Sequence, residues 1–547
     1  MRTVEILFVA LALALCALSS VAAPRVTRTE VVGPFTGHDA KLHPENLSPN
    51  RIEYYGTDLG FSYGHKGQIQ FLFGDTWATE AYAPIQKSTG GRYDDSFGSV
   101  DLKTYANAAR ITSDRIPLIK LGQNSGTTEM SAIDPGVAMD LGKTPMAGFS
   151  NGTREFGIFN VTKPQGCRVA ADCGGGLACD TELGFVGARY SEEQGLTLPC
   201  FDGDRGCTAD TMIDAAGKAV EDSGFCTDRT STIWANTPAG RISATALQQR
   251  VALRSLSDPR HYTDIQRWLT NKFVNATART VNDFRPERGS GSAHQDYSVA
   301  SGAGKNQRVF VWGRPGFVGV AANKRTLGVY FAYADMPAGA GFSWSLHYYT
   351  GSTAAGVPQF SSNESDAVAL DLDSNAPNVQ AGEVHDTVNQ VSIAWVGRLK
   401  KWIMFYGGGL SDLPSPPLPQ CGVLQLFTGR ECKDAVIGNG AVRMRTADNP
   451  WGPWTPPQDV LDVGERTGAG SGLYGVGGVL RNPNCTAPGC ATPTRSLAYH
   501  AEEYGFLYGT NIIEQWIRPS GAGVDVLWNA STWDPYRVIL LRTHIDP

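Results

Sequence analysis

Acidic side chains stand at the edges of several short apolar segments of this chain. Asp58 comes just before the first segment, Asp75 follows the run Ile69–Phe73, and Asp134 lies within the next segment. Hydrolysis of a glycosidic bond needs one carboxyl group that protonates the leaving oxygen. It also needs an ionised carboxylate that activates water or attacks carbon. These three aspartates are therefore the catalytic candidates.

Other polar and aromatic residues could bind sugar. Asp386 and Asn389 also precede an apolar run, His385 could hydrogen-bond to sugar hydroxyls, and Trp77 could stack on a sugar ring. The alternative for each aspartate is a turn residue that caps its own backbone, and for the tryptophan a place in the core. Asp58 is the favoured site residue, because Gly56 and Gly60 flank it and allow the close backbone packing expected at a crowded axis. For the other residues both interpretations stay open.

The general acid has further candidates among the glutamates. Glu155 and the pair Glu502 and Glu503 lie beside short apolar runs, although a solvated charge explains the pair equally well. Motifs for metal catalysis, for a serine nucleophile (G-x-S-x-G) and for a phosphate loop are missing from the sequence. We therefore predict no metal and no cofactor.

The elements that would position these residues are short β-strands. The chain has 63 Gly, 31 Pro and 10% aromatic residues, and its apolar runs are separated by Gly, Pro, Asn and Asp. We count five hairpin units, at 55–77, 131–162, 308–335, 389–454 and 474–542. Recurrent hairpins are typical of a β-propeller, in which the inner strands of all blades start around one funnel. A sandwich or jelly roll is the alternative.

One segment has the spacing of a helix. Ser257 and Pro259 precede Ile265, Trp268 and Phe273, and the apolar residues recur every three to four positions. We therefore expect one short amphipathic helix near 257–275. The predicted fold class is all-β: a five-bladed β-propeller with a Cys-rich insertion and one short helical segment.

The start of the chain and its cysteines indicate secretion. Residues 1–23 have a basic start, an apolar core and small residues at the end, as in a signal peptide. Ten of the 11 cysteines would remain after cleavage, and six of them lie within 163–230, which predicts a disulfide-rich insertion. We expect an extended lead-in at 24–50 and a propeller domain at 51–547.

The expected partner is a polysaccharide. The net charge of −6 comes without a basic stripe for nucleic acid, and no later apolar run is long enough to span a membrane. N-x-S/T sequons favour a glycoprotein. They occur at Asn46, Asn151, Asn160, Asn275, Asn363, Asn484 and Asn529. We expect a monomer.

Three motifs carry a resemblance to a known family. The chain resembles a secreted domain family of formerly unknown function that includes endo-D-arabinanases. The motifs that carry the resemblance are, in order, Gly56–Gly60 followed by Phe71–Trp77, then Arg443–Trp454, then Ser531–Arg542. The resemblance spans about 51–545, interrupted by the insertion. It implies a five-bladed propeller with acidic residues in its funnel, and it places Asp58, followed by Asp75, in the best matching motif.

The prediction is a secreted glycoside hydrolase that cleaves furanosidic, arabinan-like or related polysaccharide linkages by carboxylate acid/base catalysis. In this hypothesis Asp58 is the base or nucleophile. The alternative is a non-catalytic carbohydrate-binding propeller. A sialidase is weaker, because the S-x-D-x-G-x-x-W box of that class is absent from the sequence.

Overall fold

The computed structural model describes part of the chain. The described residues are 23–36, 57–74, 96–105, 108–112, 120–121, 131–132, 143–161, the backbones of strands between 166 and 270, and 272–273. They continue with 275–281, 307–314, 329–336, 345–372, 390–407, 442–461, 507–532 and 537–547. Most described residues lie in antiparallel strands.

The strands form five sheets of four or five strands each. The first holds β2 (Leu59–His65), β3 (Gln68–Phe73), β4 (Ser96–Asp101), β5 (Lys120–Leu121) and β6 (Ser131–Ala132), and the second β7 (Lys143–Ser150), β8 (Glu155–Val161), β18 (Leu247–Arg254) and β19 (Tyr262–Thr270). The third holds β20 (Asn275–Val281), β21 (Arg308–Arg314), β22 (Tyr330–Asp335), β23 (Leu346–Ser352) and β24 (Pro358–Ser361). The fourth holds β25 (Val391–Val396), β26 (Lys401–Gly407), β27 (Val442–Ala447) and β28 (Gln458–Leu461). The fifth holds β29 (Leu507–Ile512), β30 (Arg518–Ser520), β31 (Gly523–Thr532), β32 (Arg537–Asp546) and β1 (Arg25–Pro34).

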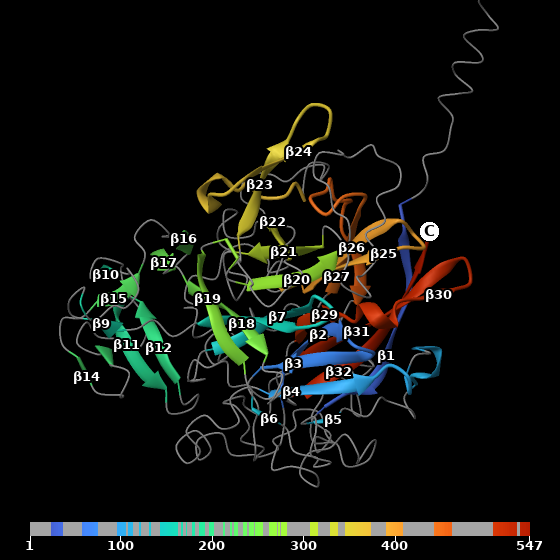
Figure 1. Cartoon of the computed structure of the whole chain (residues 1–547), viewed down its shortest axis with the longest axis horizontal. Helices are drawn as coiled ribbons and strands as arrows, with labels where there is room; N and C mark the ends of the chain where they lie inside the picture. The colour runs from blue at the N-terminus through green and yellow to red at the C-terminus, as the bar shows by residue number, and fades with distance from the viewer. Residues whose placement is uncertain are drawn as a thin grey trace, which may run out of the picture.

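The first strands of the five sheets make a ring. Strands β2, β7, β20, β25 and β29 contact one another in cyclic order, so that β29 returns to β2. The other strands of each sheet follow outward from this ring (Figure 1). This radial arrangement is a mostly-β propeller, and it excludes the sandwich and the jelly roll.

The core lies between neighbouring sheets. Five clusters of buried apolar side chains fill the spaces between neighbouring sheets, one cluster for each pair of sheets. Aromatic rings pack against each other there, such as Trp312 and Trp402, whose ring centres are 5.3 Å apart. Each large side chain that is fully buried stabilises the fold by about 1.5–3 kcal/mol. Apolar burial of this kind requires every sheet to have a neighbour on both faces, which a closed ring provides.

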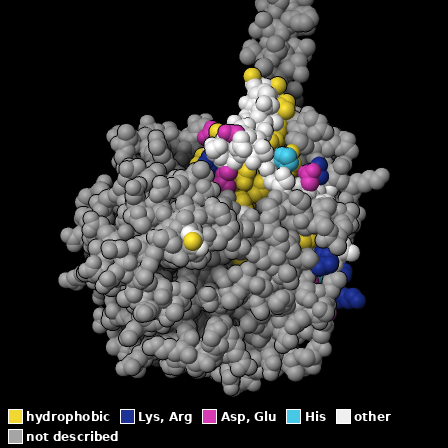
Figure 2. Space-filling view, turned by 60° about the vertical axis from the view of Figure 1, so that its left-hand side comes forward, with side chains coloured by type: hydrophobic (Ala, Val, Ile, Leu, Met, Phe, Trp, Pro, Cys, Tyr) yellow, Lys and Arg dark blue, Asp and Glu magenta, His cyan; other side chains and the backbone are white. Residues whose placement is uncertain are grey.

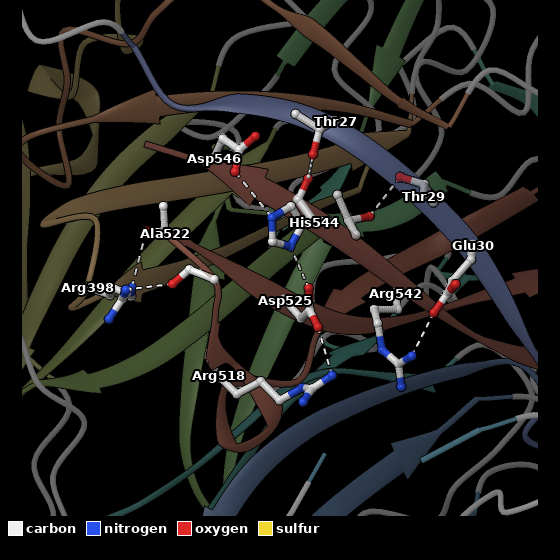
Figure 3. A network of polar contacts seen from close by, with 12 residues as sticks. Thr27, Thr29, Glu30, Arg398, Arg518, Ala522, Asp525, Arg542, His544 and Asp546 are labelled. Carbon is white, nitrogen blue, oxygen red and sulfur yellow. Dashed lines mark hydrogen bonds and ion pairs between the residues drawn. The ribbon is translucent and has the colours of Figure 1, made fainter. Parts of the chain in front are cut away.

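The ring is closed by the two ends of the described chain. Strand β1 pairs antiparallel with β32, so ten residues of the expected lead-in form a strand of the fifth sheet. One ion pair joins the two end strands: Arg542 of β32 lies 2.6 Å from Glu30 of β1. On the same sheet, His544 of β32 lies between Asp525 of β31 at 2.7 Å and Asp546 at 3.2 Å (Figure 3). The remaining lead-in, 37–50, lies outside the described residues.

The predicted helix near 257–275 is wrong. This segment contributes strand β19, which pairs along its whole length with β18, and then enters β20. The apolar spacing fits a strand end as well, because Trp268 and Thr270 alternate into the core and the Thr270 hydroxyl accepts a hydrogen bond from the Phe273 amide at 3.0 Å. Backbone pairing with β18 decided the structure here.

Short 3₁₀ turns are the helical elements of the described chain: η2 (Ala108–Arg110), η7 (Glu364–Asp366) and η8 (Glu514–Trp516). None of the described helices is long and apolar enough to cross a membrane. On the face drawn in Figure 2, described acidic side chains lie beside basic ones in the upper part of the view, and a further group of basic side chains lies lower on the right.

Strands β8 and β18 are neighbours in the second sheet, but the chain between them forms a group of small sheets. It comprises β9 (Gly166–Cys167), β10 (Ala178–Asp180), β11 (Phe185–Ser191), β12 (Leu196–Phe201), β13 (Met212–Ile213), β14 (Ala219–Val220), β15 (Gly224–Thr227), β16 (Ile233–Thr237) and β17 (Gly240–Ala244). The register places Cys179 opposite Cys226. The small sheets gather to one side of the ring (Figure 1).

Candidate functional site

Asp58 lies at the start of β2, the inner strand of the first sheet. Its side chain is 8% exposed, and its Oδ2 accepts a hydrogen bond from the Tyr508 hydroxyl at 2.7 Å. Tyr508 belongs to β29, so this bond joins the first sheet to the last across the ring closure. A carboxylate held by a hydroxyl donor is fixed in one orientation, as a catalytic carboxylate must be.

The opening hairpin holds the backbone of Asp58. The Gly74 amide donates to the Asp58 carbonyl at 3.1 Å, and the Thr57 hydroxyl donates to the Gly74 carbonyl at 3.1 Å. At the far end, His65 and Gln68 flank the turn residues Lys66 and Gly67, whose φ values of 44° and 80° fit a two-residue hairpin turn. The predicted hairpin is confirmed.

The residue after Asp58 has an unusual backbone. Leu59 has a φ of 63° and Gly60 a φ of 77°, and the register of β2 shifts between Leu59 and Phe61. A non-glycine residue in the left-handed region costs about 1–3 kcal/mol and persists only when its surroundings fix it. This bulge turns the Asp58 side chain away from the regular course of the strand.

Polar side chains of the last sheet fix this bulge. The Leu59 amide donates to Ser531 Oγ at 2.6 Å, and Asn529 Nδ2 donates to the Leu59 carbonyl at 2.8 Å. Asn511 Nδ2 in turn contacts the Gly60 carbonyl at 3.1 Å and Asn529 Oδ1 at 2.8 Å. Ser531 opens the third resemblance motif, so the first and third motifs meet at Asp58.

The second resemblance motif, Arg443–Trp454, has a different place. Arg445 is buried and donates to the Tyr406 hydroxyl at 3.0 Å and to the Thr455 carbonyl at 3.0 Å. Trp312 donates to the Pro450 carbonyl at 2.8 Å. These contacts lie in the outer strands of the third and fourth sheets, so this motif holds sheets together rather than forming part of the site.

A second polar cluster lies at the other end of strand β2, away from Asp58. His65 Nδ1 lies 2.7 Å from Ser150 Oγ, and His65 Nε2 lies 3.7 Å from Glu155 Oε2. The Tyr63 hydroxyl also donates to Glu155, at 3.1 Å, and the Thr280 hydroxyl donates to the Ser150 carbonyl at 3.1 Å. Glu155 therefore lies at the other end of β2 from Asp58 and is not its acid partner.

Serine, histidine and glutamate in this order resemble a hydrolytic triad, but the surroundings do not fit one. Ser150 is 8% exposed, and its Oγ already accepts a hydrogen bond from the Gly152 amide at 2.9 Å. The neighbouring Asn151 amide is bound to the Arg154 carbonyl. Both amides that could stabilise an oxyanion are used, so the cluster connects β2, β7 and β20.

An arginine also bridges inner strands near that end. Arg279 of β20 donates to the Ile393 carbonyl of β25 at 2.8 Å and to the Ile512 carbonyl of β29 at 3.2 Å. Its Nε lies 3.1 Å from Glu514 Oε1. Burial raises the pKa of Glu514, and the positive charge of Arg279 opposes this shift.

Of the predicted site residues, Asp58 is the one that the structure describes. Asp75, Asp134, His385, Asp386, Asn389 and Trp77 lie outside the described residues. Tyr508 was missed, because the run Leu507–Ile512 contains Gly, Thr and Asn and does not look like a strand. Its signal is weak: an aromatic residue at the start of a short, mixed segment. No group of three or more metal-ligating side chains occurs among the residues that the structure describes.

Comparison with known proteins gives no close relative. No protein-family model and no curated protein matches the sequence. Among solved structures, a GH62 hydrolase in complex with xylotriose matches with a TM-score of 0.31 and 7% identity, over 94% of this chain and 97% of that chain. The α-L-arabinofuranosidase PaAbf62A from Podospora anserina, in complex with cellotriose, matches with a TM-score of 0.30 and 7% identity, over 95% and 98%. Likeness at this level assigns no residue a role.

Proposed function

We propose that this protein is a glycoside hydrolase that cleaves furanosidic, arabinan-like or related polysaccharide linkages. The supporting observation is Asp58, a buried carboxylate fixed by Tyr508 at the start of an inner strand and followed by a left-handed Leu59. In this proposal Asp58 acts as the base or the nucleophile. A second carboxyl group must protonate the leaving oxygen, and Asp75 and Asp134 are its candidates.

We also infer that the chain is a five-bladed propeller. Each of the five large sheets counts as one blade, and their inner strands form the ring. Residues that start the inner strands then surround one funnel. His385, Asp386, Asn389 and Trp77 are the proposed sugar contacts, because they lie before the fourth sheet or after the opening hairpin in the sequence.

The experiment compares Asp58→Asn with the wild type on a panel of arabinans and related polysaccharides, by release of reducing ends. Loss of a catalytic carboxylate should lower the rate by about 10²–10⁴-fold. The matched control is Asp448→Asn, because Asp448 is an exposed partner of Lys401 and such pairs contribute little. Unchanged hydrolysis by Asp58→Asn would refute the role. Oligosaccharide binding without product release, insensitive to this change, would identify a carbohydrate-binding propeller instead.

We further propose that the protein is secreted as a monomer after removal of residues 1–23. The apolar leader and the ten cysteines that remain after it support secretion. The disulfide-rich insertion at 163–230 belongs to the same proposal.

A further inference from the structure

Contacts between the inner strands show which of their ends lie together. His65, Ser150 and Thr280, near the last residues of β2, β7 and β20, are joined by side-chain contacts. Ser392 Oγ, on the second residue of β25, accepts from the amide of Ile512, the last residue of β29, at 2.8 Å, so β25 begins level with the end of β29. Each of the five strands is the inner strand of its sheet, and the inner strands of a propeller run in the same direction. The residues that precede these contacts therefore lie on the Asp58 side of them.

Two buried amide side chains precede these contacts in their strands and so lie on the Asp58 side of them. Asn275 is the first residue of β20 and is 2% exposed, and Gln390 directly precedes β25 and is 4% exposed. Neither Asn275 Nδ2 nor Gln390 Oε1 has a hydrogen-bond partner within the described structure. Buried polar groups in native proteins are nearly always hydrogen-bonded, so each of these atoms needs a ligand or a water molecule.

The two amides complement each other. Strands β20 and β25 are neighbours in the ring, and Asn275 leaves a donor unused while Gln390 leaves an acceptor unused. A sugar hydroxyl accepts and donates at the same time. Arg314, fully buried, lies opposite Asn275 in the register, and burial lowers the pKa of Arg314 to about 9.

We propose that Asn275 and Gln390 form a sugar-binding subsite beside Asp58, which positions a neutral, hydroxyl-rich sugar of the substrate. The inference rests on the proposed glycoside hydrolase function. The subsite donates from Asn275 and accepts at Gln390, and neither residue takes part in bond cleavage. Its loss therefore weakens substrate binding more than it slows the chemical step.

The test measures KM and kcat on the polysaccharide that the wild type hydrolyses best. Asn275→Leu and Gln390→Met keep the approximate side-chain size and remove the amide. Each should raise KM about three- to tenfold with little change in kcat. Each should also raise Tm, because an apolar group replaces an unpartnered polar one.

The matched control is Gln70→Met. Gln70 is equally buried and leaves its Oε1 unpartnered, but it lies on β3, outside the ring. Its replacement should leave KM unchanged. If Asn275→Leu does not fold, Asn275→Asp keeps the shape and removes the donor, and KM should still rise.

The outcomes separate the two proposals. If the wild type neither hydrolyses nor binds any polysaccharide, the proposed function is overturned, and the subsite with it. A wild type whose hydrolysis depends on Asp58, with KM unchanged in the Asn275 and Gln390 variants, overturns the subsite alone and assigns the two amides to bound water. A glycan found on Asn275 would also overturn the subsite.

Discussion

Gly74 is the position at which a single methyl group should displace the candidate catalytic carboxylate. A Cβ on Gly74 would lie closer than 3.0 Å to Asp58 Oδ1 and 2.8 Å from Leu59 Cδ1. The backbone of Gly74 is not left-handed, so an alanine there meets a steric obstacle and no conformational one. Because Tyr508 holds the other carboxylate oxygen, Asp58 cannot rotate away without losing that hydrogen bond.

The expected cost of Gly74→Ala is therefore that of overpacking, about 1–3 kcal/mol in the free energy of unfolding. A carboxylate displaced by roughly 1 Å should also lower kcat/KM about 10²-fold. Gly397→Ala is the control, because a Cβ there meets a single atom at 3.8 Å. It should change stability by less than about 1 kcal/mol.

Denaturant unfolding of a double-mutant cycle tests the reasoning. In an Asp58→Ala background the oxygen that obstructs the new methyl group is gone, so Gly74→Ala should cost about 0.5–3 kcal/mol less than in the wild type. If Gly74→Ala costs the same in both backgrounds, or no more than Gly397→Ala, the proposed steric contact with Asp58 is wrong.

Two other predictions address pH dependence and secretion. Burial raises the pKa of Glu514, so the folded protein binds this proton more tightly than the unfolded chain does. The ionised form then lowers stability above the raised pKa, and this loss disappears as the pH falls toward 4.5. Glu514→Gln should thus be more stable than the wild type at pH 7 and equal to it near pH 4, as measured by denaturant midpoints; a variant that is less stable at pH 7 contradicts this. If the protein is secreted by a glycosylating cell, peptide mapping should find a glycan on the exposed Asn363. Three other sequon asparagines are buried, namely Asn151, Asn275 and Asn529. A glycan on one of these three would contradict the structure.

The strands of the fold could be predicted where an apolar run is bounded by glycine turns. The opening hairpin and the runs at 308–314, 391–396 and 401–407 are such cases, and each forms a strand of the predicted kind. The error at 257–275 arose because apolar spacing of three to four residues is shared by short helices and by strand ends. Strand β29 was missed because its polar residues bond to other sheets, as Asn511 does, instead of facing solvent.

The site was less predictable than the fold. Asp58 could be chosen from its residue type, its flanking glycines and its place before a strand. Its partners could not, because Tyr508, Asn529 and Ser531 lie more than 440 residues away in the chain. Spacing along a sequence identifies contacts within one hairpin, whereas a ring brings together residues from its first and last sheets.

The position of Asp58 therefore depends on ring closure. The bulge at Leu59 is strained by itself, and the groups that satisfy its amide and carbonyl, Ser531 and Asn529, come from β31. That strand is held in turn by β32, which pairs with β1. A substitution that breaks the ion pair between Arg542 and Glu30 should weaken this closure. The site should then be disturbed before the other sheets unfold, because the bulge loses its support first. The candidate site lies at the closing seam of the propeller, so it forms only when β1 and β32 are both in place.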